Sequence, residues 1–595
     1  MIVTYNIRKI SIQDISKRKY DVKMLGKKDE RYFIQQQNNH AFRQIKQVLQ
    51  NKKYIEIYNL NQKIKQINKK YNREIDQDKK THLFNKILKL KNQLKDIQRM
   101  DEMIFLQSPK KNKKSLIKVL KSGFYYNGEK YIRFGKSASQ AKQGVTVFIR
   151  QKYYDEMLER SQLGIKVKKC VISKYEAYRN LILSACEFAE MELPNIVIVD
   201  DFAKTIPNQY IRYVEKEDVE YIDKKTKEKK IYKGKKVVKE SYKDIEIEPF
   251  DGMGIHTKEI GEKWAKAINL KYIPISYQVR IPFMKGMSTQ APIKEIYKEW
   301  GITEITDMFG YKHKVEDIDC IWTKSMWKGC GIFKDEFGNE AFNEYMNRLR
   351  KYNYCMGFSK YSHRADHMQL YTKMNFQYLQ CLDLWNKKYI DYFEKRKAGK
   401  EVEYYDFLDE NNYGKVTNIA KYSTDLIEKI MNDDKLYTYK FLGISDTSYT
   451  NVESKMLKAM LINEDMFYDS CIKNMLKRQL NKTINQMKYG KVFAKGFYHI
   501  VVGDIKGLLE YAAGLEVKGC LKEREMYSAE MEKGKCLSMR SPLVDPSEIN
   551  KVTMTSNEWI DEYLGYFKGS DVVMINLYDI SLPQQGGINI CPLYK

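Results

Sequence analysis

The sequence predicts an α+β protein of several domains, and three observations lead to this prediction. Segments with apolar residues at helical spacing alternate with short aromatic and β-branched runs that end at turn residues. The chain has 595 residues, of which 43% are hydrophobic, so it can bury several cores. Its 11 prolines are too few for a long proline-rich linker. We therefore expect packed domains that follow one another directly.

The charge balance indicates a polyanionic partner. Lys and Arg number 105 against 77 Asp and Glu, which gives a formal net charge of +28 spread along the chain. Such an excess favours nucleic acid over a small neutral substrate. No apolar run reaches the ~20 residues of a bilayer span, and the first residues lack the apolar centre of a signal peptide. The ten cysteines form no C-x-x-C pair, so we expect a cytoplasmic, reducing location.

Residues 1–110 are expected to form an N-terminal helical region. Two stretches carry apolar residues at helical spacing, namely Leu60, Ile64, Ile67 and Tyr71, then Ile87, Leu90, Leu94 and Ile97. We predict two helices in a hairpin and interpret their charged faces as solvated. We assign no chemistry to this region.

Residues 111–245 are expected to form an α+β region that binds nucleic acid. Asn127-Gly128 predicts a tight hairpin turn, and 174–191 has helical spacing. The run NIVIVDD predicts a buried strand that ends at Asp200 and Asp201. Two alternating runs around the charged tip KKTKEKK, within 211–245, predict a long, exposed and basic hairpin.

The rest of the chain divides into three segments that differ in their predicted content of helices and strands. Residues 246–345 mix short strands with one helix, and 346–490 are expected to be a mostly helical connector. Strands return in 491–595, as in GFYHIVVGD and SDVVMINLYDISLP.

One stretch, 251–286, combines turn glycines with a polar strand. Gly252 and Gly254 permit a tight turn with close approach of the backbone to a ligand, beside the carboxylate of Asp251. Gln278 and Arg280 lie two apart and share a strand face, and Pro282 is expected to end that strand just before a turn that carries Lys285 and Gly286. By residue type alone, this stretch also fits an ordinary basic strand.

Two further lysines follow a predicted strand in DIDCIWTKSMWKGCGIF. If Lys324 and Lys328 lie near Lys285, the three amines form a cationic pocket suited to triphosphate oxygens. The alternative is that each is a solvated surface lysine, which is the usual state of this residue type.

These motifs, taken in order, resemble a known family. DGMG at 251–254, PISYQVRIPFMKG at 274–286 and SMWK at 325–328 are similar to the first double-psi β-barrel of gene-silencing-type RNA-dependent RNA polymerases and of their phage and mobile-element relatives. Three flanking blocks agree with that family in order: RFGKSASQAK at 133–142, NFQYLQCLD at 375–383 and RSPLVDPSEINKV at 540–552.

The resemblance implies a single-chain fold with two double-psi β-barrels and template-directed RNA synthesis from NTPs. The first barrel would occupy 246–345, and the second would begin in 491–595. Lys285 and Lys328 would be the catalytic lysines. The implied nucleotide-binding residues are Asp251, Gly252, Gly254, Gln278, Arg280, Gly286 and Lys324. The implied nucleic-acid-binding residues are Arg133, Lys136, Ser137, Gln140, Lys142, Asn375, Gln377 and Arg540.

The sequence departs from the family in its metal ligands. The family binds Mg²⁺ through an Asp-x-Asp-Gly-Asp loop, which is expected shortly after Gly587 but occurs nowhere in the 595 residues. We therefore expect the second barrel to be truncated and the chain alone to be inactive. A truncation, a frameshift or a split gene would each explain the missing loop, and a split gene would place it on a separate C-terminal fragment.

Other residues are weak substitutes for those ligands. Asp317 and Asp319 form a D-x-D on a predicted strand, and Asp200 and Asp201 end another, but such acidic pairs are usually solvated edges or helix caps. His363 and His367 lie four apart, as in some zinc hydrolases. We interpret them as a pair on a surface helix.

Two alternatives stay open at this point. The first is a DNA-dependent single-chain RNA polymerase of phage type, because no motif distinguishes an RNA template from a DNA template. The second is a non-catalytic, basic remnant that binds nucleic acid mainly through release of counterions.

Overall fold

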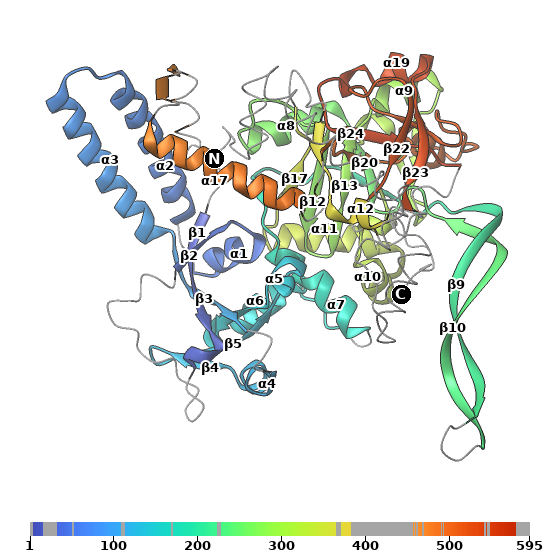
Figure 1. The fold of residues 1–595 in the computed structure, drawn as a ribbon, viewed down its shortest axis with the longest axis horizontal. Helices are drawn as coiled ribbons and strands as arrows, with labels where there is room; N and C mark the ends of the chain where they lie inside the picture. Colours follow the sequence, from blue (N-terminus) through green and yellow to red (C-terminus); the bar gives the residue numbers. More distant parts are fainter. Residues whose placement is uncertain are drawn as a thin grey trace, which may run out of the picture.

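The computed structural model describes most of the chain. The described ranges are 4–15, 33–49, 53–108, 113–167, 170–222, 228–364, 371–381, 469–488, 493–540 and 548–578, with single positions between 456 and 491 and at 543. The structure has both helices and several sheets, which confirms the predicted α+β class. Figure 1 shows the sheets packed side by side, with a helical hairpin and a β-hairpin extending from opposite sides.

The first sheet has six strands in the order β2-β1-β3-β6-β5-β4. They are β1 (Thr4–Ser11), β2 (Phe33–Gln37), β3 (Arg99–Gln107), β4 (Phe124–Tyr126), β5 (Glu129–Gly135) and β6 (Val145–Arg150). The β4–β5 turn is Asn127-Gly128, with both φ angles positive, as predicted. The expectation of a helical region over 1–110 needs correction, because β1 to β3 lie there and the sheet runs across residue 110.

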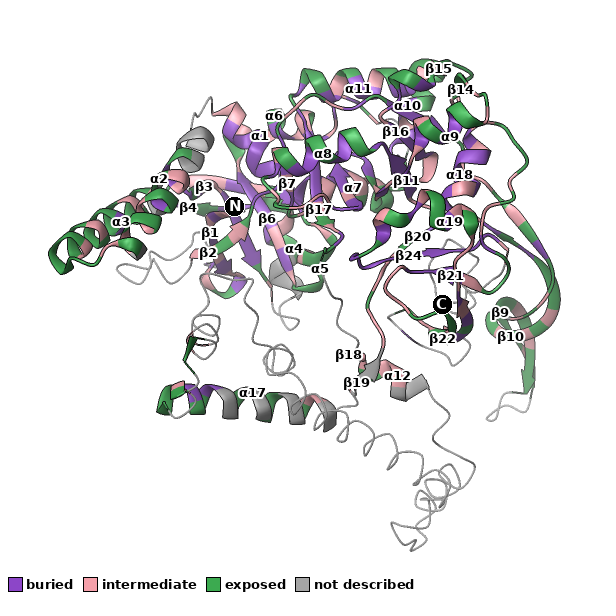
Figure 2. Cartoon of the chain, turned by 90° about the horizontal axis from the view of Figure 1, so that it is seen from above, coloured by how far each residue is buried: buried purple, intermediate pink, exposed green. Residues whose placement is uncertain are grey.

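The two predicted helices of the N-terminal region are present. They are α2 (Lys53–Arg73) and α3 (Gln77–Ile97), and they pack against each other as an antiparallel hairpin. Figure 2 shows that most of their described surface is exposed. A shorter helix, α1 (His40–Val48), is buried among neighbouring elements, with Asn39 as its N-cap.

The central sheet has seven strands in the order β7-β17-β12-β13-β11-β16-β8. They are β7 (Glu187–Ala189), β8 (Ile196–Val199), β11 (Met253–His256), β12 (Ser276–Ile281), β13 (Met284–Gln290), β16 (Cys320–Thr323) and β17 (Met356–Tyr361). Strand β8 is buried throughout, as predicted for NIVIVDD. The sheet therefore takes strands from both sides of 246–345.

One prediction around this sheet was wrong, and one strand was not foreseen. The predicted helix over 174–191 ends early, because α7 (Ile172–Arg179) leads into a 3₁₀ turn at Asn180–Leu183 and then into β7. Strand β17 lies within the expected, mostly helical connector. It pairs with β12 and β7 in the central sheet. Residues 382–455 of that connector lie outside the described residues, and they include the last two positions of the NFQYLQCLD block, 382 and 383.

A long antiparallel ribbon separates β8 from β11 in the sequence. It consists of β9 (Lys204–Ile222) and β10 (Lys229–Ile247), which confirms the predicted exposed hairpin. Its tip, 223–227, is outside the described residues. Figure 1 shows the ribbon extending well away from the sheets.

The last sheet has five strands in the order β20-β24-β21-β23-β22. They are β20 (Ile500–Val502), β21 (Glu525–Tyr527), β22 (Gly534–Ser538), β23 (Asn550–Met554) and β24 (Val572–Ile575). Strands β20 and β24 fall in the two segments predicted as strands. Residues from 579 onward lie outside the described part.

The other elements surround these sheets. The helices are α4 (Lys113–Ser122), α5 (Ala138–Lys142), α6 (Tyr154–Ser161), α8 (Lys258–Ala267), α9 (Ile293–Glu299), α10 (Cys330–Phe337), α11 (Ala341–Lys351), α12 (Phe376–Cys381), α17 (Ser470–Lys488), α18 (Ile505–Ala512) and α19 (Glu558–Tyr563). Two small strand pairs are β14 (Glu304–Thr306) with β15 (Lys312–Lys314), and β18 (Tyr371–Lys373) with β19 (Phe493–Lys495).

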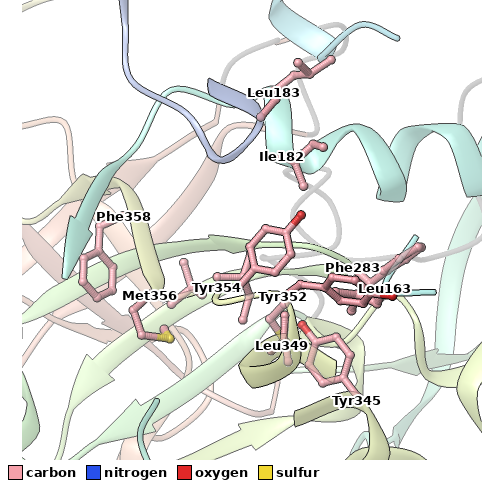
Figure 3. Packing of buried hydrophobic residues seen from close by; sticks show 14 of the residues in the cluster. Leu163, Ile182, Leu183, Phe283, Tyr345, Leu349, Tyr352, Tyr354, Met356 and Phe358 are labelled. Atoms are coloured by element: carbon pink, nitrogen blue, oxygen red, sulfur yellow. The ribbon is translucent and has the colours of Figure 1, made fainter. Parts of the chain in front are cut away.

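Two large cores hold the sheets together. One joins the first sheet, α1, α11 and one side of the central sheet, and Figure 3 shows part of it around Phe283, Tyr345 and Phe358. The other joins the central sheet to the last sheet through residues such as Phe250, Leu508 and Phe567. None of the helices in the described part of the chain is long and apolar enough to cross a membrane.

Candidate active site

The hairpin β12–β13 positions the first lysine of the site. Its turn is Pro282-Phe283, with Phe283 at φ 58°, and the Tyr345 hydroxyl donates to the Pro282 carbonyl at 2.6 Å. Lys285 lies in β13, directly opposite Arg280 in β12. Pro282 ends β12 as predicted, but Lys285 and Gly286 are in the strand after the turn and not in the turn itself. Both residues pair with β12, which fixes the direction of the Lys285 side chain.

The segment after β16 positions the other two lysines. A bridge between Met284 and Trp327 joins this segment to the start of β13. Trp327 and Cys330 are buried before and after the half-buried Lys328, so the chain is anchored on both sides of this lysine. Lys324, the third lysine, begins a 3₁₀ turn directly after β16. Lys285 thus lies in β13, and Lys324 and Lys328 lie in the segment after β16 that is bridged to the start of β13.

The turn before β11 brings a carboxylate to the lysines. The Gly252 N–H donates to Ser325 Oγ at 2.7 Å, and the Gly252 carbonyl accepts from Met287 N at 2.9 Å. Gly252 itself has φ 66°, a conformation that favours glycine. These contacts tie the turn to both lysine segments, so Asp251 lies within electrostatic reach of Lys285 and Lys328.

Each charged group at this point perturbs the others. Partial burial, then Arg280 and Lys328, lower the pKa of Lys285, while Asp251 opposes the shift. Burial, helped by Asp201, raises the pKa of Asp251, and Lys328, Ser325 and Lys285 oppose the shift. The oxygen Oδ1 of Asp251 is buried and has no hydrogen-bond partner among the described residues. The positive side chains here outnumber the nearby carboxylates, and one oxygen of Asp251 has no hydrogen bond among the described residues. Perturbed charged groups of this kind are typical of a functional site.

Arg280 adds a buried positive charge to the same strand. Its side chain is only 8% exposed, and burial lowers the pKa of the guanidinium to about 10. One nitrogen, Nη1, donates to the Val279 carbonyl at 2.7 Å. No carboxylate in the described part of the chain forms an ion pair with it. A buried guanidinium in this state is suited to bind an anion such as phosphate.

The remaining predicted nucleotide-binding residues have internal contacts. Gln278 accepts a hydrogen bond from the Ser359 hydroxyl at 2.8 Å. A Cβ at Gly254 would lie 2.2 Å from Trp322, and one at Gly286 would lie 2.6 Å from the Gly252 carbonyl oxygen. Both glycines are therefore required by close packing within the protein.

Asp200 and Asp201, at the end of β8, contact the third lysine segment. Lys324 Nζ lies 2.8 Å from Asp200 Oδ1, and Ser325 N donates to Asp201 Oδ1 at 2.8 Å. Burial raises the pKa of Asp200, but Lys324 and the Asp201 N–H outweigh it, so the pKa is lowered overall. Sequence reasoning did not foresee this pairing, although the position of an acidic pair after a buried strand was visible. Because Lys324 is paired with Asp200, it is not an unpaired cation at the site.

The other candidate ligands are engaged elsewhere. Asp319 Oδ2 accepts from Asn195 N at 2.9 Å, and Asp317 lies in a 3₁₀ turn, so this D-x-D is not on a strand as predicted. His363 lies in a loop, not on a helix, and its Nδ1 is 3.0 Å from Asp571 Oδ2. His367 is outside the described residues. Within the described ranges, no group of three or more His, Cys, Asp or Glu side chains is arranged to hold a metal ion.

The predicted nucleic-acid-binding residues fall in two places. Ser137 and Gln140 form the capping box of α5. Arg133, Lys136 and Lys142, around them, are exposed. In the second place, Gln377 Oε1 accepts from Leu543 N at 3.3 Å, and Asn375 Oδ1 accepts from Gln377 N at 3.1 Å. This contact joins two blocks far apart in the sequence, and the second block begins at the exposed Arg540.

Comparison with known proteins gives a consistent result. A family model described as RNA dependent RNA polymerase matches residues 85–568. The DNA-directed RNA polymerase YonO of Bacillus phage SPbeta is 22% identical over 437 residues, which are 71% of this chain and 44% of that protein. The chain thus spans less than half the length of this relative. The RNA dependent RNA polymerase QDE-1 from Thielavia terrestris is 15% identical, with a TM-score of 0.45 over 80% of this chain and 46% of that one.

Proposed function

The chain belongs to the RNA-dependent RNA polymerase family, and on that premise we propose that it binds NTPs and a nucleic-acid template for template-directed RNA synthesis. The observation that carries the proposal is the convergence of Lys285, Lys328 and Asp251 from three neighbouring segments of the central sheet. Two amines and the buried Arg280 exceed the nearby negative charge, which suits a triphosphate.

In this proposal, each residue has a separate task. Lys285 and Lys328 donate hydrogen bonds to phosphate oxygens of the NTP and offset the charge that develops during nucleotidyl transfer. Arg280 adds positive charge from β12, opposite Lys285, and Gln278 lies on the same face of that strand. Asp251 holds the two amines in place. Its unsatisfied Oδ1 supports this assignment, because it can accept a further hydrogen bond at the site.

We further propose that the central sheet corresponds to the first double-psi β-barrel and the last sheet to the start of the second. Mixed pairing supports this assignment: β11 is parallel to β13 and antiparallel to β16, while β20 is parallel to β24. Arg133, Lys136 and Lys142 would then contact the template backbone from the first sheet, and Arg540 from the last.

The family implies Mg²⁺, but the described residues do not fit it. Two carboxylates near the lysines already have partners, because Asp200 pairs with Lys324 and Asp201 accepts from Ser325 N. The hard-oxygen cage that Mg²⁺ needs is therefore not formed by this set. We derive no catalytic step through the metal.

The choice of template is a second open proposal. The phage relative is named a DNA-directed RNA polymerase, and the matched family model is RNA dependent. We favour RNA as template and keep DNA as the alternative. Binding competition between matched RNA and DNA strands decides between them, because a site that contacts ribose 2′-hydroxyls binds the RNA strand more tightly.

The proposal is tested by the affinity of the chain for ATP. We expect Lys285→Ala and Lys328→Ala each to weaken ATP binding by about tenfold or more, because each removes a charge-assisted contact of about 1.5–3 kcal/mol. Lys263→Ala is the matched control, since Lys263 is an exposed lysine on α8. ATP binding that is equal in all three variants would contradict the lysine assignment. It would favour the basic, non-catalytic remnant instead.

A further inference from the structure

The ribbon β9–β10 has two chemically different faces. In an antiparallel pair, residues opposite each other share a face, and successive residues alternate. The register therefore places Tyr210, Val214 and Lys216 of β9 on one face with Tyr242, Val238 and Lys236 of β10. We call these six residues the tyrosine face. The opposite face carries Tyr213, Glu215 and Glu217 with Lys243, Lys239 and Lys235.

The opposite face is satisfied within the ribbon. Lys239 Nζ lies 3.0 Å from Glu215 Oε2 and also forms an ion pair with Glu217. Lys243 Nζ lies 3.7 Å from the centre of the Tyr213 ring. Positive and negative groups alternate on this face, so it has little excess charge to offer a partner.

The two lysines of the tyrosine face are not satisfied in this way, although Glu240, which the register also places on this face, accepts a hydrogen bond from the Tyr210 hydroxyl. Lys216 and Lys236 are directly opposite each other and both exposed, and neither forms an ion pair within the described part of the ribbon or of the body. Like charges at opposite positions destabilise a strand pair unless an anion lies between them. The side chains of Tyr210 and Tyr242 are 56% and 66% exposed, with ring centres 5.3 Å apart. Val214 and Val238 are exposed between these pairs.

Strand β10 also carries a run of positive charge, which the register divides between the two faces. Six lysines and no acidic residue occur between Lys229 and Lys239. The neighbouring acids of β9 are engaged by Lys239 on the other face. The ribbon thus presents aromatic rings and the amines of Lys216 and Lys236 along one surface. It extends away from β13, the strand that carries Lys285 (Figure 1). Amines bind phosphates, and rings of this kind stack on bases or pack on sugars.

We propose that the tyrosine face is a second nucleic-acid-binding surface, which holds the strand outside the active site. The choice of nucleic acid over another polyanion rests on the proposed function. Lys216 and Lys236 contact consecutive phosphates, and the two tyrosine rings contact the adjacent nucleotides.

The test measures binding of the full chain to fluorescent single-stranded RNA, single-stranded DNA and duplex DNA across a range of salt concentrations. The double variant Lys216→Ala/Lys236→Ala should weaken binding on the order of tenfold at low salt. For single strands, its plot of log affinity against log salt should be shallower by about 1.4 in slope, since two phosphate contacts are lost. The matched control, Lys235→Ala/Lys243→Ala, removes the same charge from the opposite face and should change affinity less than twofold.

ATP affinity, measured on the same samples, separates this inference from the proposed function. Equal nucleic-acid affinity and salt slope in both double variants, with ATP binding intact, would overturn the ribbon surface alone. Loss of nucleic-acid binding only in the Lys216/Lys236 variant supports the ribbon surface even if the chain fails to bind ATP. If that variant instead changes self-association in sedimentation and leaves every probe equally bound, the face binds protein and the proposal is wrong.

Discussion

At the scale of single residues, two buried histidines link the fold to pH. His40 and His256 are fully buried, and desolvation lowers the pKa of each to about 3. The Nε2 of His40 is 2.9 Å from the Arg280 carbonyl, which can only accept, so this nitrogen carries the proton. Both rings are therefore neutral in the folded protein at ordinary pH.

Because each folded-state pKa lies below the unfolded value of 6.5, stability is lost as pH falls through 6.5. Each histidine should contribute about 1.4 kcal/mol of lost stability per pH unit below that point. Denaturant unfolding at pH 7 and at about pH 5 measures the loss. The variant His256→Phe keeps the aromatic packing against Trp264 and should show a loss smaller by roughly 2 kcal/mol over that interval. An identical pH dependence in variant and parent would contradict this explanation.

At the scale of elements, one carboxylate organises the start of α18. Asp504 is fully buried and accepts from Gly507 N at 3.0 Å, Cys520 N at 2.8 Å and Leu521 N at 3.0 Å. It thus caps the helix and fixes the 519–521 loop at the same time. Burial raises the pKa of Asp504, although the three N–H groups oppose the shift.

Asp504→Ala should therefore destabilise the protein by at least about 3 kcal/mol, since three buried donors lose their acceptor. Ser137→Ala is the matched control, because Ser137 caps α5 through a single long hydrogen bond of 3.3 Å at a partly exposed site. We expect the control to cost about 1 kcal/mol or less. Thermal unfolding of both variants measures the difference, and similar losses in the two would show that Asp504 is only a helix cap.

Elements with local signals were predictable from the sequence, and elements with distant partners were not. Asn127-Gly128 marks its own turn, and the alternation of the ribbon specifies two strands. Strand β1, in contrast, pairs in parallel with β3, about ninety residues later, as in the pair Ile7 with Met100. Nothing in the local sequence reports such a partner, and strand assignment depends strongly on context.

The same distinction applies to the candidate site. Lys285, Lys328 and Asp251 were predicted from motifs that keep their spacing along the chain. The Lys324–Asp200 ion pair spans 124 positions and arises only because β8 lies next to β16 in the sheet. Gly254 and Gly286 were expected to approach a ligand, but the structure shows that they are packed against Trp322 and the Gly252 carbonyl.

At the scale of the whole molecule, the central and last sheets share one core. Phe250 is 1% exposed and lies in one core with Leu508 of α18 and Met574 of β24, and the Tyr297 hydroxyl donates to the Leu509 carbonyl at 3.0 Å. A shared core makes the two sheets unfold as one unit.

Phe250→Ala should cost about 3–5 kcal/mol, because it leaves a cavity in that core. Hydrogen exchange should then rise together in β16 and β24, one strand from each sheet. The exposed Phe84 of α3 is the matched position, and Phe84→Ala should change stability by less than about 0.5 kcal/mol. Faster exchange in β24 alone would show that the last sheet opens independently.

The central claim, that Lys285 and Lys328 hold the NTP phosphates, is tested most directly by lysine acylation. The full chain is acylated briefly with and without saturating ATP, and the modified lysines are mapped by mass spectrometry. We predict strong ATP protection of Lys285 and Lys328, with Lys263 on α8 and the β10 lysines unchanged. Protection confined to other lysines, while ATP is bound, would contradict the account.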